Sequence, residues 1–177
     1  MSLDSHNELR TPRLVLIAIT PAMLNSEKLA DQKLGDLIGC AIPSNWPPIH
    51  WEPHVLYVLL EQYERHPEQI SWHRYVALLT GDGTRTLIGT IGAFWRETSP
   101  MECEIGYSIL PPHEGQGLAT EAAQALIQLI RTNPRIKSVI AHTFPELAGS
   151  IRVMEKCGMV FDGQGEEERT IRYRLQL

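Results

Sequence analysis

Hydrophobic and polar positions change their period several times along the chain, and each change marks the boundary of a predicted element. The nearly continuous apolar run from Arg13 to Ile19 predicts a buried strand. The Thr-Pro pair after it is typical of a helix start, and helical segments are expected to about Ile38. A proline-rich loop from Cys40 to Pro53 then precedes a helix predicted from about Pro53 to His66.

The middle of the chain favours strands. The segments His73–Thr80 and Thr86–Phe94 flank a Gly-Asp-Gly turn, which predicts a β-hairpin. Glu102 to Leu110 is expected to form the next strand, and Ser138 to Thr143 a short buried one.

Between the last two strands, apolar residues recur at helical spacing and predict an amphipathic helix that ends near Asn133. The recurring positions are Leu118, Ala122, Ala125, Leu126, Leu129 and Ile130. A second helix is predicted from Ser150 to Cys157, with Gly158 as the residue that closes it. The tail is expected to return as two strands around a polar turn at Gly163–Glu168.

This alternation of strands and helices predicts an α/β fold with a mixed sheet. The chain has 177 residues, of which 43% are hydrophobic, so it can bury a sizeable core. Neither an internal repeat nor a low-complexity linker interrupts it. We therefore expect one domain over residues 1–177.

Charge and targeting signals restrict the partners. The formal net charge of −5 and the pI near 5.8 provide no broad basic surface for a nucleic-acid backbone, so nucleic acid is not an expected partner. A cationic amine suits a mildly acidic protein better. No signal peptide or membrane span is recognisable, so we expect a cytoplasmic protein. Cys40, Cys103 and Cys157 are an odd number at wide spacing, which favours buried thiols in a reducing compartment.

The segment ECEIGYSILPPHEGQGLAT, from Glu102 to Thr120, places a strand, a diproline break, a glycine-rich loop and a helix start in succession. Gly115 and Gly117 allow the backbone to approach an anion, and the first amides of the following helix lack an intrahelical acceptor. This order predicts a loop that binds a phosphorylated ligand. A dinucleotide fingerprint would need glycine at position 120, and a P-loop would need Gly-Lys followed by Ser or Thr, so both are excluded.

The same loop resembles the CoA-pyrophosphate loop of the GCN5-related N-acetyltransferases (GNAT), whose pattern is Gln or Arg, two residues, Gly, one residue, then Gly or Ala. Gly117 and Ala119 match this pattern, whereas Glu114 replaces the Gln or Arg and places an acid near a diphosphate. Further segments resemble, in order, the branch that acetylates ribosomal-protein amino termini (RimJ/RimL-like). These are LRTPRLVLIAITP at Leu9–Pro21, LIGTIGAF at Leu87–Phe94, CEIGYSILPP at Cys103–Pro112 and SIRVMEKCGM at Ser150–Met159.

The resemblance implies a GNAT fold, with a mixed central sheet of about six to seven strands flanked by helices. In the family, the strands corresponding to Glu102–Leu110 and Ser138–Thr143 splay apart, and the pantetheine arm of acetyl-CoA lies in the gap. The residues implied to bind CoA are Ile109, Leu110, Gly115, Gln116, Gly117, Leu118, Ala119, Thr120 and Ser150. No metal is expected, because Pro53 at a helix start separates His50 from His54.

Transfer of an acetyl group from a thioester to an amine needs a proton acceptor, since amines with a pKa of about 8 to 10.4 are mostly protonated at neutral pH. Glu104 is the predicted catalytic base, because it matches the position of the catalytic glutamate in histone-acetylating members of the family. The alternative is a structural carboxylate that pairs with a basic residue or caps a loop. Glu102, two residues away on the same strand face, is a second candidate. His142 is a further candidate, either as a base that acts through water or as a packed histidine.

The leaving thiolate needs a proton or a hydrogen bond. Many family members supply it from a tyrosine whose position Met154 occupies here. Ser150 is the remaining predicted catalytic acid and matches a serine given this role in the RimJ/RimL-like branch; it is otherwise a helix N-cap or a CoA contact. Leu147 replaces the asparagine that usually precedes this serine by three residues.

The favoured interpretation is an acetyl-CoA-dependent N-acetyltransferase. It would transfer the acetyl group in a ternary complex to a primary amine, either a protein N-terminal α-amine or a small molecule. The departures at Glu114, Leu147 and Met154 keep two alternatives open: a CoA-binding protein without catalysis, acting as sensor or partner-binding module, and a structural domain that retains only the fold. Trp46 and Trp51 are expected either to wall the acceptor pocket or to cover a core edge. A monomer and a homodimer are both compatible with the sequence.

Overall fold

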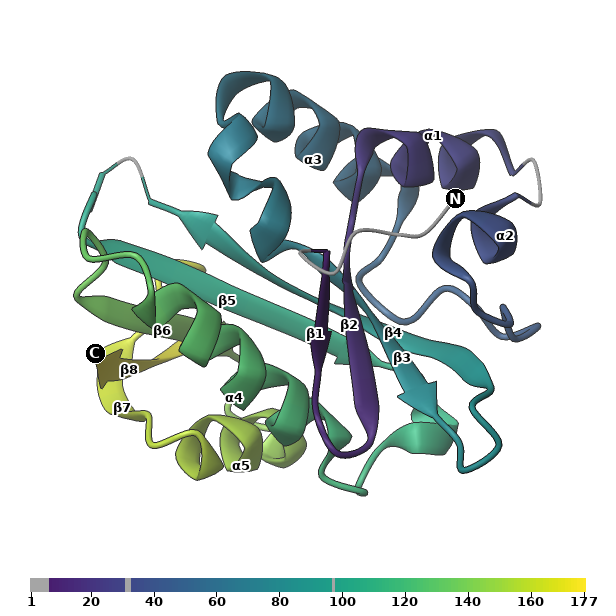
Figure 1. Cartoon of the computed structure of the whole chain (residues 1–177). Coiled ribbons are helices and arrows are strands. Elements are labelled where there is room, and N and C mark those ends of the chain that lie inside the picture. The colour runs from purple at the N-terminus through teal and green to yellow at the C-terminus, as the bar shows by residue number, and fades with distance from the viewer. Residues whose placement is uncertain (1–6, 31–32, 97) are drawn as a thin grey trace.

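An eight-stranded mixed sheet forms the centre of the molecule, with the strand order β1-β2-β3-β4-β5-β6-β8-β7 (Figure 1). The computed structural model describes residues 7–30, 33–96 and 98–177. Residues 1–6, part of the segment in which no signal peptide was recognised, and residues 31–32 of the predicted helical stretch lie outside these ranges.

The bounds of the elements are as follows. The strands are β1 (Glu8–Arg10), β2 (Leu14–Ala18), β3 (Arg74–Leu79), β4 (Arg85–Trp95), β5 (Glu102–Ile109), β6 (Ser138–Thr143), β7 (Val160–Gln164) and β8 (Ile171–Gln176). The helices are α1 (Pro21–Leu29), α2 (Leu34–Ile38), α3 (Pro53–Arg65), α4 (Leu118–Arg131) and α5 (Ala148–Lys156), with 3-10 turns η1 (Pro67–Trp72) and η2 (Pro111–His113). None of the described helices is both long enough and apolar enough to cross a bilayer.

Helices cover both faces of the sheet, with α4 and α5 on one face and α1, α2 and α3 on the other (Figure 1). Strand β2 contributes to both cores. Leu14 and Leu16 belong to the core that contains α4, and Val15 and Ile17 to the core that contains α1 and α3; all four are at most 1% exposed. A strand that is buried on both faces has no polar alternation, which is why its sequence is an unbroken apolar run. The predicted buried strand is confirmed.

Helix ends follow local signals. Thr20 caps α1, since its Oγ1 accepts a hydrogen bond from the Met23 backbone N–H at 3.4 Å, and Pro21 occupies the first helical position as predicted. Gly158 adopts a φ of 81° just beyond α5, as predicted for the closing residue.

The start of α5 corrects one interpretation. The helix begins at Ala148, and Leu147 occupies the N-cap position without a side-chain hydrogen bond. Ser150 therefore lies inside the first turn and is not the N-cap. The asparagine expected at position 147 would have been a favourable cap, so its loss removed the local signal for the true helix start.

The sheet has more strands than the expected six to seven, because β1 carries no periodic pattern. Its three residues include one apolar side chain, Leu9, and they pair antiparallel with β2. Glu8 also forms an ion pair with Arg85, with 2.5 Å between Oε1 of Glu8 and Nη1 of Arg85. An edge strand held by such distant partners cannot be recognised from its own sequence.

Strands β5 and β6 separate part-way along their length. They pair in parallel at Glu102↔Ser138, Cys103↔Val139 and Glu104↔Ile140, and the pairing stops there. Beyond this point β5 continues along β4, while β6 continues along β8. The splayed strand pair expected from the family resemblance is present.

Candidate active site

The glycine-rich loop forms an exposed turn ahead of α4. Gly115 and Gly117 have φ values of 71° and 77°, which glycine adopts without strain. A Cβ at Gly115 would meet no atom within 4 Å, so the loop is open on this side. The first bond of α4 runs from the Glu121 N–H to the Gly117 carbonyl, which leaves the amides of residues 118–120 without an intrahelical acceptor. An open turn followed by free helix amides is the arrangement that binding of a phosphorylated ligand requires.

Arg13, which the sequence reasoning missed, fastens this loop to the turn between β1 and β2. Its Nη1 donates to the Gln116 carbonyl at 2.9 Å, and its Nε donates to the Glu121 carboxylate at 2.7 Å. Its Nη2 lies 3.7 Å from the position that a Cβ of Gly117 would occupy. Glu121 is 108 residues away in the sequence, so no local pattern could have revealed the pair.

The Glu121 carboxylate is stabilised by several donors. Burial raises its pKa, but hydrogen bonds from Thr11 and Arg13, together with the Arg13 charge, outweigh this effect and lower the pKa below its usual range. The Thr11 hydroxyl donates at 2.5 Å. Arg13 thereby brings a guanidinium beside a loop in which Glu114 takes the place of the family's Gln or Arg.

Ile109 is the last residue of strand β5, Leu110 follows it, and both are buried. The Leu110 N–H donates to the Ile88 carbonyl at 2.8 Å, so this amide is engaged with β4.

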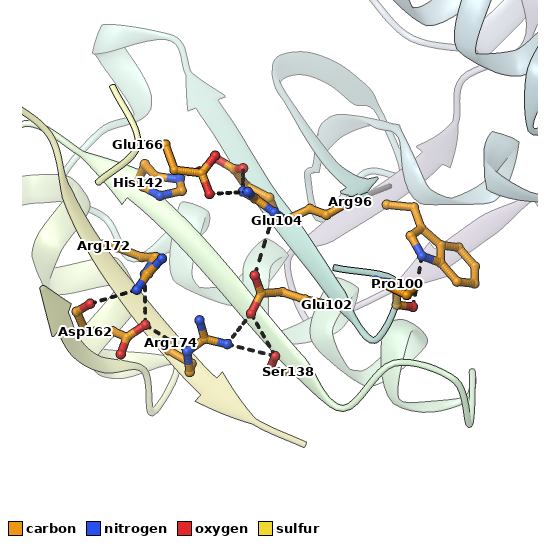
Figure 2. A network of polar contacts seen from close by, with 11 residues as sticks. Arg96, Pro100, Glu102, Glu104, Ser138, His142, Asp162, Glu166, Arg172 and Arg174 are labelled. Atoms are coloured by element: carbon orange, nitrogen blue, oxygen red, sulfur yellow. Dashed lines mark hydrogen bonds and ion pairs between the residues drawn. The ribbon is translucent and has the colours of Figure 1, made fainter. Parts of the chain in front are cut away.

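Glu104 occupies the last paired position of β5 before the strands separate. It points away from the core that contains α4, because its neighbours Cys103 and Ile105 fill that core. One carboxylate oxygen lies 2.7 Å from Nδ1 of His142, and the other accepts from Nη1 of Arg96 at 3.0 Å (Figure 2). The basic partner that a structural role requires is therefore present. The side chain is 33% exposed, so an acceptor can still approach it from solvent.

Glu102 is held more deeply in the same polar network (Figure 2). It pairs with Arg174 and accepts from the Ser138 hydroxyl at 3.1 Å. The residue is 8% exposed, so it has less access to an acceptor than Glu104.

His142 contacts the candidate base. Its Nε2 is buried and has no hydrogen-bond partner in the described part of the chain. The ring edge with Cδ2 faces the β7–β8 turn, since a Cβ at Gly165 would lie 2.9 Å from that atom. His142 is thus placed to orient Glu104 through Nδ1.

Ser150 meets a tyrosine that the sequence reasoning did not select. The Tyr107 hydroxyl donates to the Ser150 carbonyl at 3.1 Å and lies 3.2 Å from its Oγ. Burial raises the pKa of Tyr107 to about 12, so the phenol is protonated at neutral pH. Met154 is 2% exposed and belongs to the core that contains α4. Strand β5 therefore supplies a hydroxyl close to the predicted acid, although α5 carries no tyrosine at position 154.

The tryptophans of the proline-rich loop are tied to α1. Trp46 and Trp51 each donate an indole N–H to Glu27, at 2.7 Å and 3.1 Å. The Tyr75 hydroxyl donates to the same carboxylate. Trp51 belongs to the core that contains α1 and α3, and Trp46 packs against that core, which favours the role of covering a core edge.

The three cysteines are free thiols. Burial raises the pKa of Cys40 and Cys157 to about 11 and that of Cys103 to about 12. A protonated thiol is a poor nucleophile, so none suits an acetyl-carrying role. Among the described residues, no cluster of His, Cys, Asp or Glu could hold a metal ion.

The family model of the acetyltransferase (GNAT) domain matches residues 27–160. The chain belongs to the GNAT acetyltransferase family. Acetyltransferases of this family use acetyl-CoA as the acetyl donor, and the matched range contains the splayed strands and the glycine loop of the GNAT fold described above.

Two curated relatives come from Bacillus subtilis (strain 168). Uncharacterized N-acetyltransferase YnaD is 36% identical over 77 residues, which are 44% of this chain and 45% of YnaD. Probable N-acetyltransferase YjcK is 28% identical over 106 residues, which are 59% of this chain and 57% of YjcK. The matches thus span about half the length of each relative.

Solved structures match nearly the whole chain. The Microcin C7 self immunity acetyltransferase MccE, in complex with acetyl-CoA and AMP, has a TM-score of 0.62 at 16% identity and covers 94% of both chains. A protein from Vibrio cholerae, provisionally named a ribosomal-protein-serine acetyltransferase, has a TM-score of 0.61 at 18% identity and covers 96% of this chain and 97% of its own. A spermidine N-acetyltransferase SpeG chimera from Vibrio cholerae and hSSAT has a TM-score of 0.59 at 19% identity, with 92% and 95% covered. The TM-scores show a common fold, and at such low identities the likeness shows the fold alone.

Proposed function

We propose that this GNAT protein transfers an acetyl group from acetyl-CoA to a primary amine by direct attack within a ternary complex. The observation that carries the proposal is the position of Glu104. Its carboxylate stands where β5 and β6 separate, and it is partly exposed on the face opposite α4. A proton acceptor at this point would lie beside the gap that receives the pantetheine arm in the family.

Different residues accept the proton of the amine and donate a proton to the leaving thiolate. The amine nitrogen attacks the thioester carbonyl carbon, and the C–S bond breaks with its electron pair on sulfur. Glu104 takes the amine proton, directly or through water, while Arg96 and His142 hold the carboxylate in place. The Ser150 hydroxyl, close to that of Tyr107, donates to the thiolate.

The acceptor we propose is a protein N-terminal α-amine or a small-molecule primary amine. The ordered segments that resemble the RimJ/RimL-like branch support the first class. The fold shared with proteins named for ribosomal-protein serine and for spermidine is compatible with both.

Release of free thiol from acetyl-CoA tests the function. The acceptors are short peptides with free amino termini, polyamines, amino acids and aminoglycosides, and CoA affinity is measured in parallel. Release with one acceptor class supports the proposal. CoA binding without release from any acceptor favours the non-catalytic alternative, to which the departures at Glu114, Leu147 and Met154 point.

The variant Glu104→Gln tests the base. We expect kcat to fall by about two orders of magnitude with CoA affinity unchanged, the usual scale for losing a general base. Glu166→Gln is the matched control, because Glu166 also pairs with Arg96 but lies on the β7–β8 turn, with its side chain 54% exposed. Equal turnover in the Glu104→Gln variant and the wild type would assign Glu104 a structural role.

A further inference from the structure

Gly106 is exposed although it lies in the middle of strand β5. Strand β5 pairs with β6 only as far as Glu104, so at Gly106 it is paired with β4 alone. Its residues Ile105 and Ile109 fill the core that contains α4, so Gly106 faces the opposite side together with Glu104 and Ser108. The helical layer on that side does not reach β5, since the core formed with α1 and α3 draws its strand residues from β2, β3 and β4.

The described residues leave the space directly above Gly106 open. A Cβ built at Gly106 would meet nothing within 4 Å. Gly92, its direct partner on β4, differs, because a Cβ there would lie 2.4 Å from Cδ2 of His73. The two glycines therefore serve different purposes: Gly92 accommodates the His73 ring, whereas Gly106 accommodates no part of the described chain. A glycine in mid-strand with no described atom close above it is typical of a place where a ligand approaches the backbone closely.

The side chains around this bare position suit an amine. Phe94 pairs directly with Glu104 across β4 and β5, so both side chains lie on this face, and Phe94 is 36% exposed. His142 contacts Glu104 on this face through Nδ1, at 2.7 Å. The accessible charge is negative, because the Glu104 side chain is 33% exposed and that of its partner Arg96 only 13%. A carboxylate beside an aromatic ring is a favourable environment for an ammonium group.

We propose that the bare stretch of sheet over Gly106 binds the acceptor amine, and that the missing side chain at position 106 sets how much bulk the amine-bearing carbon can carry. This proposal rests on the proposed function for its ligand class. The ammonium group would face Glu104 and Phe94, and the attached carbon would lie over Gly106. A methyl group added at position 106 would occupy that carbon's place.

The test uses Gly106→Ala and two isomeric probes, n-butylamine and sec-butylamine, which differ in branching at the amine-bearing carbon. Binding of each probe to the protein saturated with CoA is measured by calorimetric titration, so the result does not require turnover. We expect the variant to bind n-butylamine roughly 10-fold more weakly than the wild type and sec-butylamine more weakly still, the scale of one methylene-sized clash. The CoA affinity should not change.

Gly81→Ala is the matched control. Gly81 is also exposed, also has no atom within 4 Å of a built Cβ, and lies in the β3–β4 turn. Both variants should fold, because neither glycine has a positive φ. Equal amine affinity of the wild type and Gly106→Ala, or no amine binding to the wild type, overturns the proposal. A third outcome separates the two proposals. If the wild type binds the amine, Gly106→Ala does not, and no acceptor releases thiol, then the proposed reaction is wrong but the proposed amine site stands.

Discussion

At the scale of single residues, Tyr107 places a second hydroxyl beside Ser150, the predicted catalytic acid. A serine hydroxyl alone is a weak proton donor, but the phenol oxygen 3.2 Å from its Oγ can orient it. If the two hydroxyls act as one unit, removing either should cost most of what removing both costs. We therefore predict that Ser150→Ala and Tyr107→Phe each lower kcat about 10-fold or more, and that the double variant falls little further.

A double-mutant cycle on kcat, with thermal unfolding measured for each protein, checks this prediction. Loss of the hydrogen bond to the Ser150 carbonyl should cost about 1 kcal/mol of stability in Tyr107→Phe, so the variant should remain folded. Multiplicative effects of the two substitutions on kcat would show that the hydroxyls act independently.

At the scale of elements, Arg13 joins the β1–β2 turn to the loop that precedes α4. It bonds the carbonyl of Gln116 and the carboxylate of Glu121, and so fixes the loop relative to the helix whose free amides follow it. Preorganised donors bind an anion without an ordering cost. We predict that Arg13→Gln raises the KM for acetyl-CoA about 5- to 10-fold, with smaller changes in kcat and in the KM for the acceptor.

Arg10→Gln is the control for this prediction. It removes the same charge from the same hairpin, but Arg10 pairs with Glu8 and makes no contact to the loop in the described structure. Steady-state kinetics with acetyl-CoA varied at saturating acceptor provide the measurement. An equal shift in both variants would mean that overall charge, rather than the position of the loop, controls acetyl-CoA binding.

At the scale of the whole molecule, His73 makes stability depend on pH. It is 3% exposed, its ring lies against Gly92 and Phe94, and neither ring nitrogen has a hydrogen-bond partner in the described structure. Burial lowers its pKa from 6.5 to about 3. Between these values the unfolded chain binds a proton that the folded chain does not, so the free energy of unfolding falls as the pH drops from about 6.5 towards 3.

The variant His73→Leu should remove this dependence. Because the ring forms no described hydrogen bond, an apolar side chain of similar size should leave stability at pH 7 unchanged or slightly higher. Between pH 7 and pH 4.5 the wild type should lose about 2–3 kcal/mol more than the variant, as judged by urea unfolding. Tyr63→Phe is the control, since it removes a neighbouring buried hydroxyl that does not titrate in this range. Parallel pH profiles of His73→Leu and the wild type would contradict the assignment.

The sequence by itself determined the features whose physical cause is local. The double burial of β2 is visible as an apolar run, the Thr20 cap of α1 needs only neighbouring atoms, and the glycine loop ahead of α4 depends on the φ values of two glycines and the free amides of one helix turn. The choice of Glu104 as the candidate base followed from the family resemblance.

Only the tertiary structure decided which of these features meet. Arg13 reaches Glu121 across 108 residues, Glu104 reaches His142 across 38, and Tyr107 reaches Ser150 across 43. The role of Gly106 likewise depends on the tertiary structure, because only there do the helices leave the face of β5 opposite α4 open at this residue. The physical reason is that sheet register and the placement of helices on its faces arise from the burial of many side chains at once, so no single segment encodes them.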